Sequence, residues 1–148
     1  MSLDSGKGLK NKRYCVDTSA WHRSVHPLVA ADWATKLDAD VVSICDQVRL
    51  EILYSAQSSG NYENLLVELS ALHGLPTAVS VLPRAVEVQR QLAHVGGLHH
   101  RSVKIADLII AATAEAAGDV VWHYDSDFDR IAAITGQPTE WIAPRGSL

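Results

Sequence analysis

The sequence has few cysteines and no long apolar run. Its two cysteines, Cys15 and Cys45, are too few for a disulfide framework or a zinc ribbon. Each lies within an apolar segment, where a thiol behaves as a small hydrophobic side chain, so both are expected to be reduced core residues. The longest uninterrupted apolar run, residues 108–112, is far shorter than the roughly 20 residues that a membrane-spanning helix needs. We therefore expect no membrane-spanning segment.

An excess of positive charge is also absent. The 13 Lys and Arg residues against 17 Asp and Glu residues give a formal net charge of −4, so no overall basic field attracts nucleic acid. Any nucleic-acid partner must be held by a local basic patch or by metal ions. The N-terminal segment carries positive charge, but no apolar stretch of secretory length follows it, which favours a cytoplasmic protein.

The length and composition indicate one folded domain. A chain of 148 residues can bury roughly 68–70% of the surface that its unfolded form exposes. With 47% apolar and 20% charged residues, the composition is that of a globular protein rather than a disordered one. No internal repeat, low-complexity tract or linker divides the chain. We expect one domain over residues 13–148, after an extension over residues 1–12 that no motif assigns.

Short β-favouring runs alternate with helical patterns along the chain. Strands are expected at 14–16, 41–44, 78–82 and 120–124, with a last edge strand at 140–143. Helices are expected at 28–37, 47–56, 62–72, 83–95, 103–117 and 128–134, where apolar residues recur every three to four positions. This alternation predicts an α/β domain with a mainly parallel central sheet covered by helices on both faces.

Capping and breaking residues set the expected helix boundaries. Asp46 is expected to cap the helix over 47–56, and Gly60 to mark its end. Pro83 is expected to begin the helix over 83–95, and Gly118 is expected to end the Ala-rich helix over 103–117. The polar residues 99–102 follow a glycine pair and are expected to form a mobile loop.

Acidic residues occur where strands end and where the following helices begin. Asp17 closes the first strand and Asp125 closes the strand at 120–124, so both can project over the edge where parallel sheets bind ligands. Glu51 and Asp107 each lie about a turn and a half into a helix. The four carboxylates can therefore converge on one site.

Each of these acids also has a purely structural interpretation. Asp107 stands among apolar neighbours, where an ionised carboxylate is costly unless it is paired or bound to a cation. It can equally be a first-turn acid that is favoured by the helix dipole and paired with Lys104. Glu51 can be a partly exposed helix acid, and Asp17 can be a helix N-cap.

The segment 123–129 carries three acids at alternate positions. An EF-hand loop begins with this spacing, but it requires Gly at the sixth place and Glu at the twelfth, which here hold Arg130 and Gly136. A calcium loop of that type is excluded. The structural alternative is a cap and a turn with one solvated charge.

Several carboxylates in one pocket favour a hard divalent cation, because like charges packed together otherwise repel one another. The sequence has no nucleophile elbow, no Gly-rich phosphate loop and no CxxC motif, which disfavours covalent catalysis and nucleoside-triphosphate binding. The residues therefore point to hydrolysis of a phosphodiester assisted by Mg²⁺ or Mn²⁺.

Four fragments in this order resemble the PIN domain, and specifically the VapC-type toxin ribonucleases of toxin-antitoxin pairs. They are VDTSAW, RLEIL, IADLIIAAT and HYDSDFDRIA, followed by the tail GQPTEWIAP. The resemblance covers residues 13–143. It implies a single PIN-like domain with Mg²⁺- or Mn²⁺-dependent endoribonuclease activity that leaves 5′-phosphate and 3′-hydroxyl ends. It also implies a homodimer and a cognate antitoxin that blocks the site by inserting an Arg.

The resemblance also implies roles for individual residues. Asp17, Glu51, Asp107 and Asp125 match the family's catalytic acids, and Asp127 matches an outer position of the fourth acidic region. The metal is expected at Asp17, Asp107, Asp125 and Asp127. Thr18 or Ser19 matches a hydroxyl position that hydrogen-bonds within the acid cluster.

Arg101 and Lys104 precede Asp107 by six and three residues, which favours phosphate contacts from one helical face. Arg23, Arg84 and Arg130 are weaker candidates of the same kind, and each of these cations can instead be a solvated surface charge. His22 and His123 lie near the acids in sequence, and a polar loop or strand-end role is the simpler interpretation of each.

Three other functions remain as alternatives. VVWHYDSD resembles the strand and D-x-D of a haloacid-dehalogenase-like phosphatase, but that motif opens a domain, whereas here only 21 residues follow Asp127. A phosphorelay receiver domain requires an acid pair at the first strand and a phosphoacceptor Asp at the third, which are absent. A catalytically silent PIN-fold binding module would lack one of the acids, and here all are present.

Overall fold

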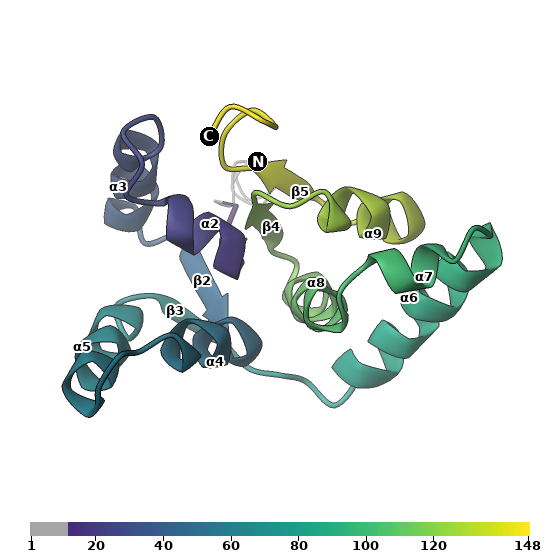
Figure 1. The fold of residues 1–148 in the computed structure, drawn as a ribbon, viewed down its shortest axis with the longest axis horizontal. Helices are drawn as coiled ribbons and strands as arrows, with labels where there is room; N and C mark the ends of the chain where they lie inside the picture. The colour runs from purple at the N-terminus through teal and green to yellow at the C-terminus, as the bar shows by residue number, and fades with distance from the viewer. Residues whose placement is uncertain (1–11) are drawn as a thin grey trace, which may run out of the picture.

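Parallel strands form the centre of the structure, a computed structural model that describes residues 12–148. In this part of the chain five strands form one sheet in the order β3-β2-β1-β4-β5, and every pair is parallel (Figure 1). The strands are β1 (Tyr14–Val16), β2 (Val42–Cys45), β3 (His73–Leu75), β4 (Val120–His123) and β5 (Thr139–Trp141). The predicted parallel α/β sheet is confirmed.

Helices flank the sheet on both sides. They are α2 (Thr18–Arg23), α3 (Ala30–Asp38), α4 (Asp46–Tyr54), α5 (Ser59–Leu69), α6 (Val81–Val95), α7 (His99–Ser102), α8 (Ile105–Ala117) and α9 (Asp127–Thr135). Helices α3 and α5 lie on one side of the sheet, and α6, α7, α8 and α9 lie on the other (Figure 1). Among the described helices, none is both long and apolar enough to cross a membrane.

The strand order places a switch point at the centre of the sheet. From β1 the chain moves outward through β2 to β3, and then it returns to the other side of β1 to form β4. In open parallel sheets the crevice for a ligand lies at such a point, beyond the carboxyl ends of the strands. Asp17 follows the end of β1 directly, and Asp125 follows β4 after one intervening residue.

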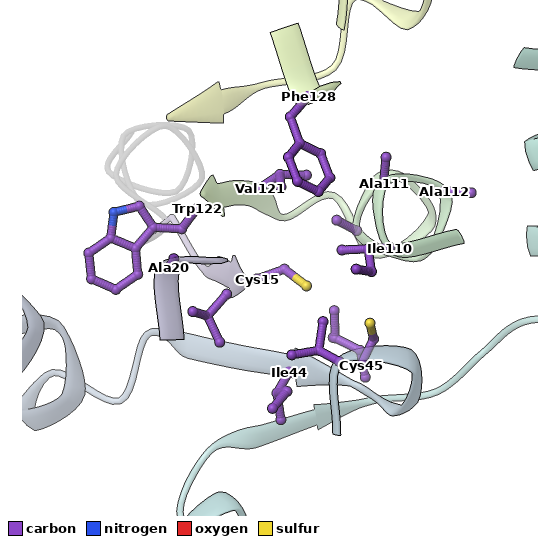
Figure 2. Packing of buried hydrophobic residues seen from close by; sticks show 14 of the residues in the cluster. Cys15, Ala20, Ile44, Cys45, Ile110, Ala111, Ala112, Val121, Trp122 and Phe128 are labelled. Carbon is purple, nitrogen blue, oxygen red and sulfur yellow. The ribbon is translucent and has the colours of Figure 1, made fainter. Parts of the chain in front are cut away.

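The core lies on both faces of the sheet, and α8 covers one of them. Strands β2 and β4 are buried along their whole length, as expected for parallel strands covered on both faces. Figure 2 shows the sulfur atoms of Cys15 and Cys45 on the side of the sheet that faces Ile110 of α8, whereas Trp122 points to the opposite side. Both cysteines are buried free thiols, as expected for reduced core residues.

The prediction of a strand at 78–82 is wrong. The third strand is instead β3, where Leu75 pairs with Cys45, and Val81 begins α6 two residues before Pro83. A proline in the first turn of a helix costs little, because the N–H that it lacks has no partner inside the helix. Val81 is buried as a helix residue, so its apolar character does not report a strand.

Residues 99–102 form the one-turn helix α7 rather than a loop. The helix ends at Ser102, and the extended residue Val103 separates it from α8. Arg101 and Lys104 therefore do not share one helical face, which corrects that part of the expectation.

Two of the expected caps are also corrected. Asp46 is the first residue of α4 rather than its cap, and Gly60 lies in the first turn of α5 rather than at a helix end. Gly118 ends α8 with a φ of 74°, as predicted, in the left-handed region that glycine adopts without strain. Helix α2 is an element that the sequence patterns missed, although Asp17 was a candidate cap there.

Phe128 anchors α9 to this core, where it is fully buried (Figure 2). We expect Phe128→Ala to lower the free energy of unfolding by about 3–5 kcal/mol, because it removes a large apolar side chain and leaves a cavity. Urea denaturation measures the change. The control is Val79→Ala at a residue that is 98% exposed, which should change the free energy by less than about 0.5 kcal/mol. Equal effects of the two substitutions would contradict the packing described here.

Candidate active site

A pocket of about 330 Å³ opens at the switch point of the sheet. Its lining comes from α2, α4, the start of α8 and the turn after β4. The lining residues are Asp17, Thr18, Ser19, His22, Arg23, Glu51, Lys104, Asp107 and Asp125. The four acids that the sequence singled out as catalytic candidates thus lie around one pocket, although they are far apart in the chain.

Asp17 is both a helix cap and a pocket acid. Its Oδ1 accepts the backbone N–H of Ala20 at 2.9 Å, and Ser19 Oγ lies 2.8 Å from both of its carboxylate oxygens. The side chain is buried, and burial raises its pKa to about 6 despite these hydrogen bonds. The structural and the functional interpretation of Asp17 are therefore compatible.

Ser19 connects the ends of the two central strands. Its hydroxyl donates to the Asp17 carboxylate and accepts the backbone N–H of Tyr124 at 2.9 Å. Because Asp17 follows β1 and Tyr124 follows β4, this one side chain fixes the distance between the two sides of the pocket.

Glu51 is held from two sides. The Thr18 hydroxyl donates to Glu51 Oε1, and Gln47 Nε2 donates to Oε2 at 3.2 Å. Gln47 lies one turn earlier in α4, and Thr18 begins α2. The carboxylate is thereby oriented at the pocket wall by neighbours that are both neutral.

Asp107 is the least satisfied acid of the pocket. It is buried in the first turn of α8, and its Oδ2 has no hydrogen-bond partner among the described residues. Burial, a hydrogen bond with Asp127 and the nearby charge of Asp125 together raise its pKa to about 8. A buried carboxylate oxygen without a donor is a position where a cation would be stabilised.

Lys104 places a positive charge among three carboxylates. Its Nζ lies 2.8 Å from Asp125 Oδ2, 3.2 Å from Asp127 Oδ2 and 3.6 Å from Asp107 Oδ2. Hydrogen bonding to Asp125 and the nearby negative charges raise the pKa of the ammonium group, although its partial burial opposes this. The structure thus places the residue that sequence reasoning assigned to phosphate binding within the acid cluster.

Asp125 and Asp127 occupy different environments. Asp125 is half-buried and lines the pocket, whereas Asp127 is buried and is not among the described lining residues. Asp127 accepts the backbone N–H of Lys104 at 3.0 Å and Arg130 Nη1 at 3.2 Å, and its own N–H donates to Asp125 Oδ1. Burial opposes its ionisation, but hydrogen bonds from Asp107 and Lys104 outweigh burial and lower its pKa. Asp107, Asp125 and Asp127 each bring an oxygen within 4.8 Å of the others.

His123 supports the turn that carries Asp125. Its ring is fully buried between Phe128 and Trp141, and its Nδ1 accepts the backbone N–H of Asp125 at 3.1 Å. Burial lowers the pKa of the ring to about 4, so it is neutral near pH 7. His123 is a strand-end residue, as the simpler interpretation had it, whereas the exposed His22 lies at the pocket wall.

Comparisons with known proteins show the family to which the chain belongs. The family model that matches is the PIN domain, over residues 14–134. This chain belongs to the PIN-domain family of VapC ribonucleases. It is 62% identical to Ribonuclease VapC18 of Mycobacterium tuberculosis over 135 residues, which cover 91% of this chain and 98% of that protein. It is 40% identical to Ribonuclease VapC51 of the same organism, with 92% of this chain and 97% of that protein covered.

Solved structures show the same fold at lower sequence identity. A DNA-bound VapBC from Salmonella typhimurium has a TM-score of 0.69 at 20% identity, with 90% of this chain and all of the other covered. VapBC-5 from Mycobacterium tuberculosis, described as a member of the VapBC family of toxin-antitoxin systems, has a TM-score of 0.55 at 26% identity. The matched region covers 86% of this chain and 96% of the VapBC-5 chain. The family expected from the sequence motifs is confirmed.

The raised pKa values of Asp17 and Asp107 make the stability of the metal-free protein depend on pH. Between the unfolded pKa near 4 and the folded values of about 6 and about 8, the native state binds more protons than the unfolded state. The free energy of unfolding should therefore fall as pH rises through this window. We expect Asp107→Asn to raise it at pH 8 by on the order of 5 kcal/mol, and to change it little near pH 4.

Urea denaturation in EDTA at both pH values measures this difference. Asp38→Asn, at an exposed acid of α3, is the matched control and should show no such dependence. If Asp107→Asn changed the free energy of unfolding equally at both pH values, titration of this buried carboxylate would not be the cause of the pH-dependent stability.

Proposed function

We propose that this chain is a cytoplasmic endoribonuclease that hydrolyses RNA phosphodiester bonds with a carboxylate-bound Mg²⁺ or Mn²⁺. The observation that carries the proposal is the convergence of Asp17, Glu51, Asp107 and Asp125 on one pocket. Membership of a ribonuclease family supports it, since the similar proteins named above are ribonucleases. The single domain would comprise residues 13–148, of which the family model matches most.

The residues of the pocket fit a hard divalent cation. Asp107 Oδ2 is buried without a donor, and the ammonium of Lys104 shows that positive charge is stabilised beside it. The available donors are carboxylate oxygens, which Mg²⁺ and Mn²⁺ prefer. We assign Asp17, Asp107 and Asp125 to the ion, with Asp127 supporting Asp125 through its backbone N–H.

When bound, the ion lowers the pKa of a water molecule and stabilises negative charge on the leaving oxygen. The chain's own residues orient the groups around it. Thr18 and Gln47 hold Glu51 at the pocket wall, where its carboxylate can orient the attacking water. Ser19 holds Asp17, and His123 holds the backbone of Asp125. The products are expected to carry 5′-phosphate and 3′-hydroxyl ends.

RNA cleavage tests this proposal directly. Purified protein incubated with total RNA should give discrete fragments in Mg²⁺ or Mn²⁺ and none in EDTA. Asp107→Asn should lower the cleavage rate by at least about 100-fold, because it removes the negative charge and replaces one carboxylate oxygen with an NH2 group at the site of the ion. Cleavage that persists in EDTA, or at an unchanged rate in Asp107→Asn, would refute a nuclease built on these acids.

The same assay distinguishes the two acids of the turn after β4. Asp125→Asn should lower the rate more than Asp127→Asn, because Asp125 lines the pocket, whereas both oxygens of the buried Asp127 already accept hydrogen bonds, from the backbone N–H of Lys104 and from Arg130. Asp38→Asn is again the control and should cleave like the unmodified chain. A larger loss in Asp127→Asn would assign the principal ligand of this turn to Asp127 instead.

We further propose that a cognate antitoxin blocks the pocket and that the chain forms a homodimer. The VapBC structures with this fold support an antitoxin partner. An antitoxin Arg would block the pocket by pairing with its acids. The position of Lys104 supports this, because a side-chain cation already fits among these acids. Light scattering of the purified chain should report twice the mass of one chain, and a monomer would contradict the dimer.

A further inference from the structure

Two adjacent aromatic rings beside the acid pocket are flanked by an arginine on each side. The guanidinium of Arg23 lies 4.4 Å from the ring centroid of Tyr124, and Tyr124 meets Trp141 edge to face with centroids 5.4 Å apart. The guanidinium of Arg145 lies 5.8 Å from the ring centroid of Trp141. We call these four residues, Arg23, Tyr124, Trp141 and Arg145, the Arg-aromatic strip. It begins at the pocket, because Arg23 is one of the lining residues.

The rings of the strip are fixed by hydrogen bonds. The Tyr124 backbone N–H donates to Ser19 Oγ, and its hydroxyl accepts the backbone N–H of Leu148 at 2.9 Å. Trp141 Nε1 donates to the Asp129 carboxylate at 3.2 Å, and the ring packs against the buried His123. Arg23 is fixed as well, since its Nη1 donates to the Ser19 carbonyl at 3.0 Å.

The two guanidinium groups of the strip keep their positive charge available. Among the described residues, neither Arg23 nor Arg145 has a carboxylate oxygen within 4.0 Å. Four other arginines do form such ion pairs, namely Arg49, Arg84, Arg90 and Arg130. An aromatic ring holds a guanidinium in place without neutralising it, so the N–H donors of the strip can bind an anion.

A chain of phosphates close to flexible bases is the partner that fits these groups. A guanidinium binds phosphate through paired N–H donors, and aromatic side chains contact bases that are not stacked within a duplex. The acid pocket itself repels RNA, and the chain as a whole has a net charge of −4. Lys104, the other cation of the pocket wall, is already paired with Asp125 and Asp127.

We propose that the Arg-aromatic strip binds the single-stranded stretch of RNA next to the phosphodiester held in the acid pocket. Arg23 contacts a phosphate at the pocket. Arg145 contacts another phosphate further along the RNA, in the direction of β5. Tyr124 and Trp141 position the two cations and contact the bases between them. This inference rests on the proposed ribonuclease function, and it adds the surface of this chain that holds the RNA beside the pocket.

The salt dependence of RNA binding tests the strip separately from cleavage. The probe is a fluorescein-labelled single-stranded RNA oligonucleotide of mixed sequence, measured by anisotropy in EDTA so that metal-dependent cleavage does not occur. In Arg23→Ala/Arg145→Ala, the slope of log Kd against log salt concentration should become shallower by about 1.4, which corresponds to two lost phosphate contacts. Trp141→Leu should weaken binding of this probe with little change in slope.

Arg90→Ala is the matched control, because it removes one positive charge from an exposed ion pair on α6. It should leave the slope unchanged, and thermal melting establishes that each variant is folded. A duplex of the same RNA sequence should depend on Trp141 less than the single strand does. Equal dependence would overturn the assignment to single-stranded RNA.

The outcomes separate this inference from the proposed function. Metal-dependent cleavage together with an unchanged salt slope in the double variant would overturn the strip and leave the nuclease standing. A slope that depends on the strip in a protein that cleaves no RNA would support the strip and contradict the nuclease. Loss of antitoxin binding with unchanged RNA binding in the double variant would overturn the assignment to RNA, because the strip would then hold a protein.

Discussion

Repulsion between carboxylates at the centre of the sheet is the constraint on which the rest of the site depends. Asp107, Asp125 and Asp127 bring oxygens within 4.8 Å of one another in a partly buried place, where water cannot screen their charges. The chain offsets this cost locally. Lys104 supplies a cation, Arg130 a second one, and Asp107 responds with a raised pKa. A group of acids that costs stability in this way is typical of a functional site.

The topology of the sheet makes the convergence of the acids possible. Because β1 and β4 are neighbours although they are far apart in sequence, the residues that follow them meet at one edge. The buried side of the molecule then fixes the turn after β4. His123 packs on Phe128 and Trp141 and accepts the N–H of Asp125, so the position of this half-buried acid depends on the packing of the buried rings of His123 and Phe128.

The sequence predicts Asp17, Asp107 and Asp125 well, because they stand at strand ends or in a first helical turn, where local patterns are informative. It predicts the β5 edge of the sheet and misses the β3 edge. The strand β3 consists of His73, Gly74 and Leu75, of which only Leu75 is buried, so it shows no alternation of apolar and polar residues. The role of Lys104 was equally hidden, because its partners Asp125 and Asp127 lie more than 20 residues away. Tyr124 and Trp141 form a surface with Arg23 only through the pairing of β4 with β5, which no local pattern shows.

Ser19 joins the negative and the positive regions of this surface. Its hydroxyl donates to the buried carboxylate of Asp17 and accepts the N–H of Tyr124, while its carbonyl accepts from the guanidinium of Arg23. Ser19 thus holds the carboxylate of Asp17, which attracts cations, apart from the guanidinium of Arg23, which attracts phosphate. Without such a spacer, Arg23 could pair with the pocket acids as Lys104 does, and each charge would cancel the other. Because the same residue holds both charges, the proposed metal ion and the proposed RNA phosphate would lie side by side.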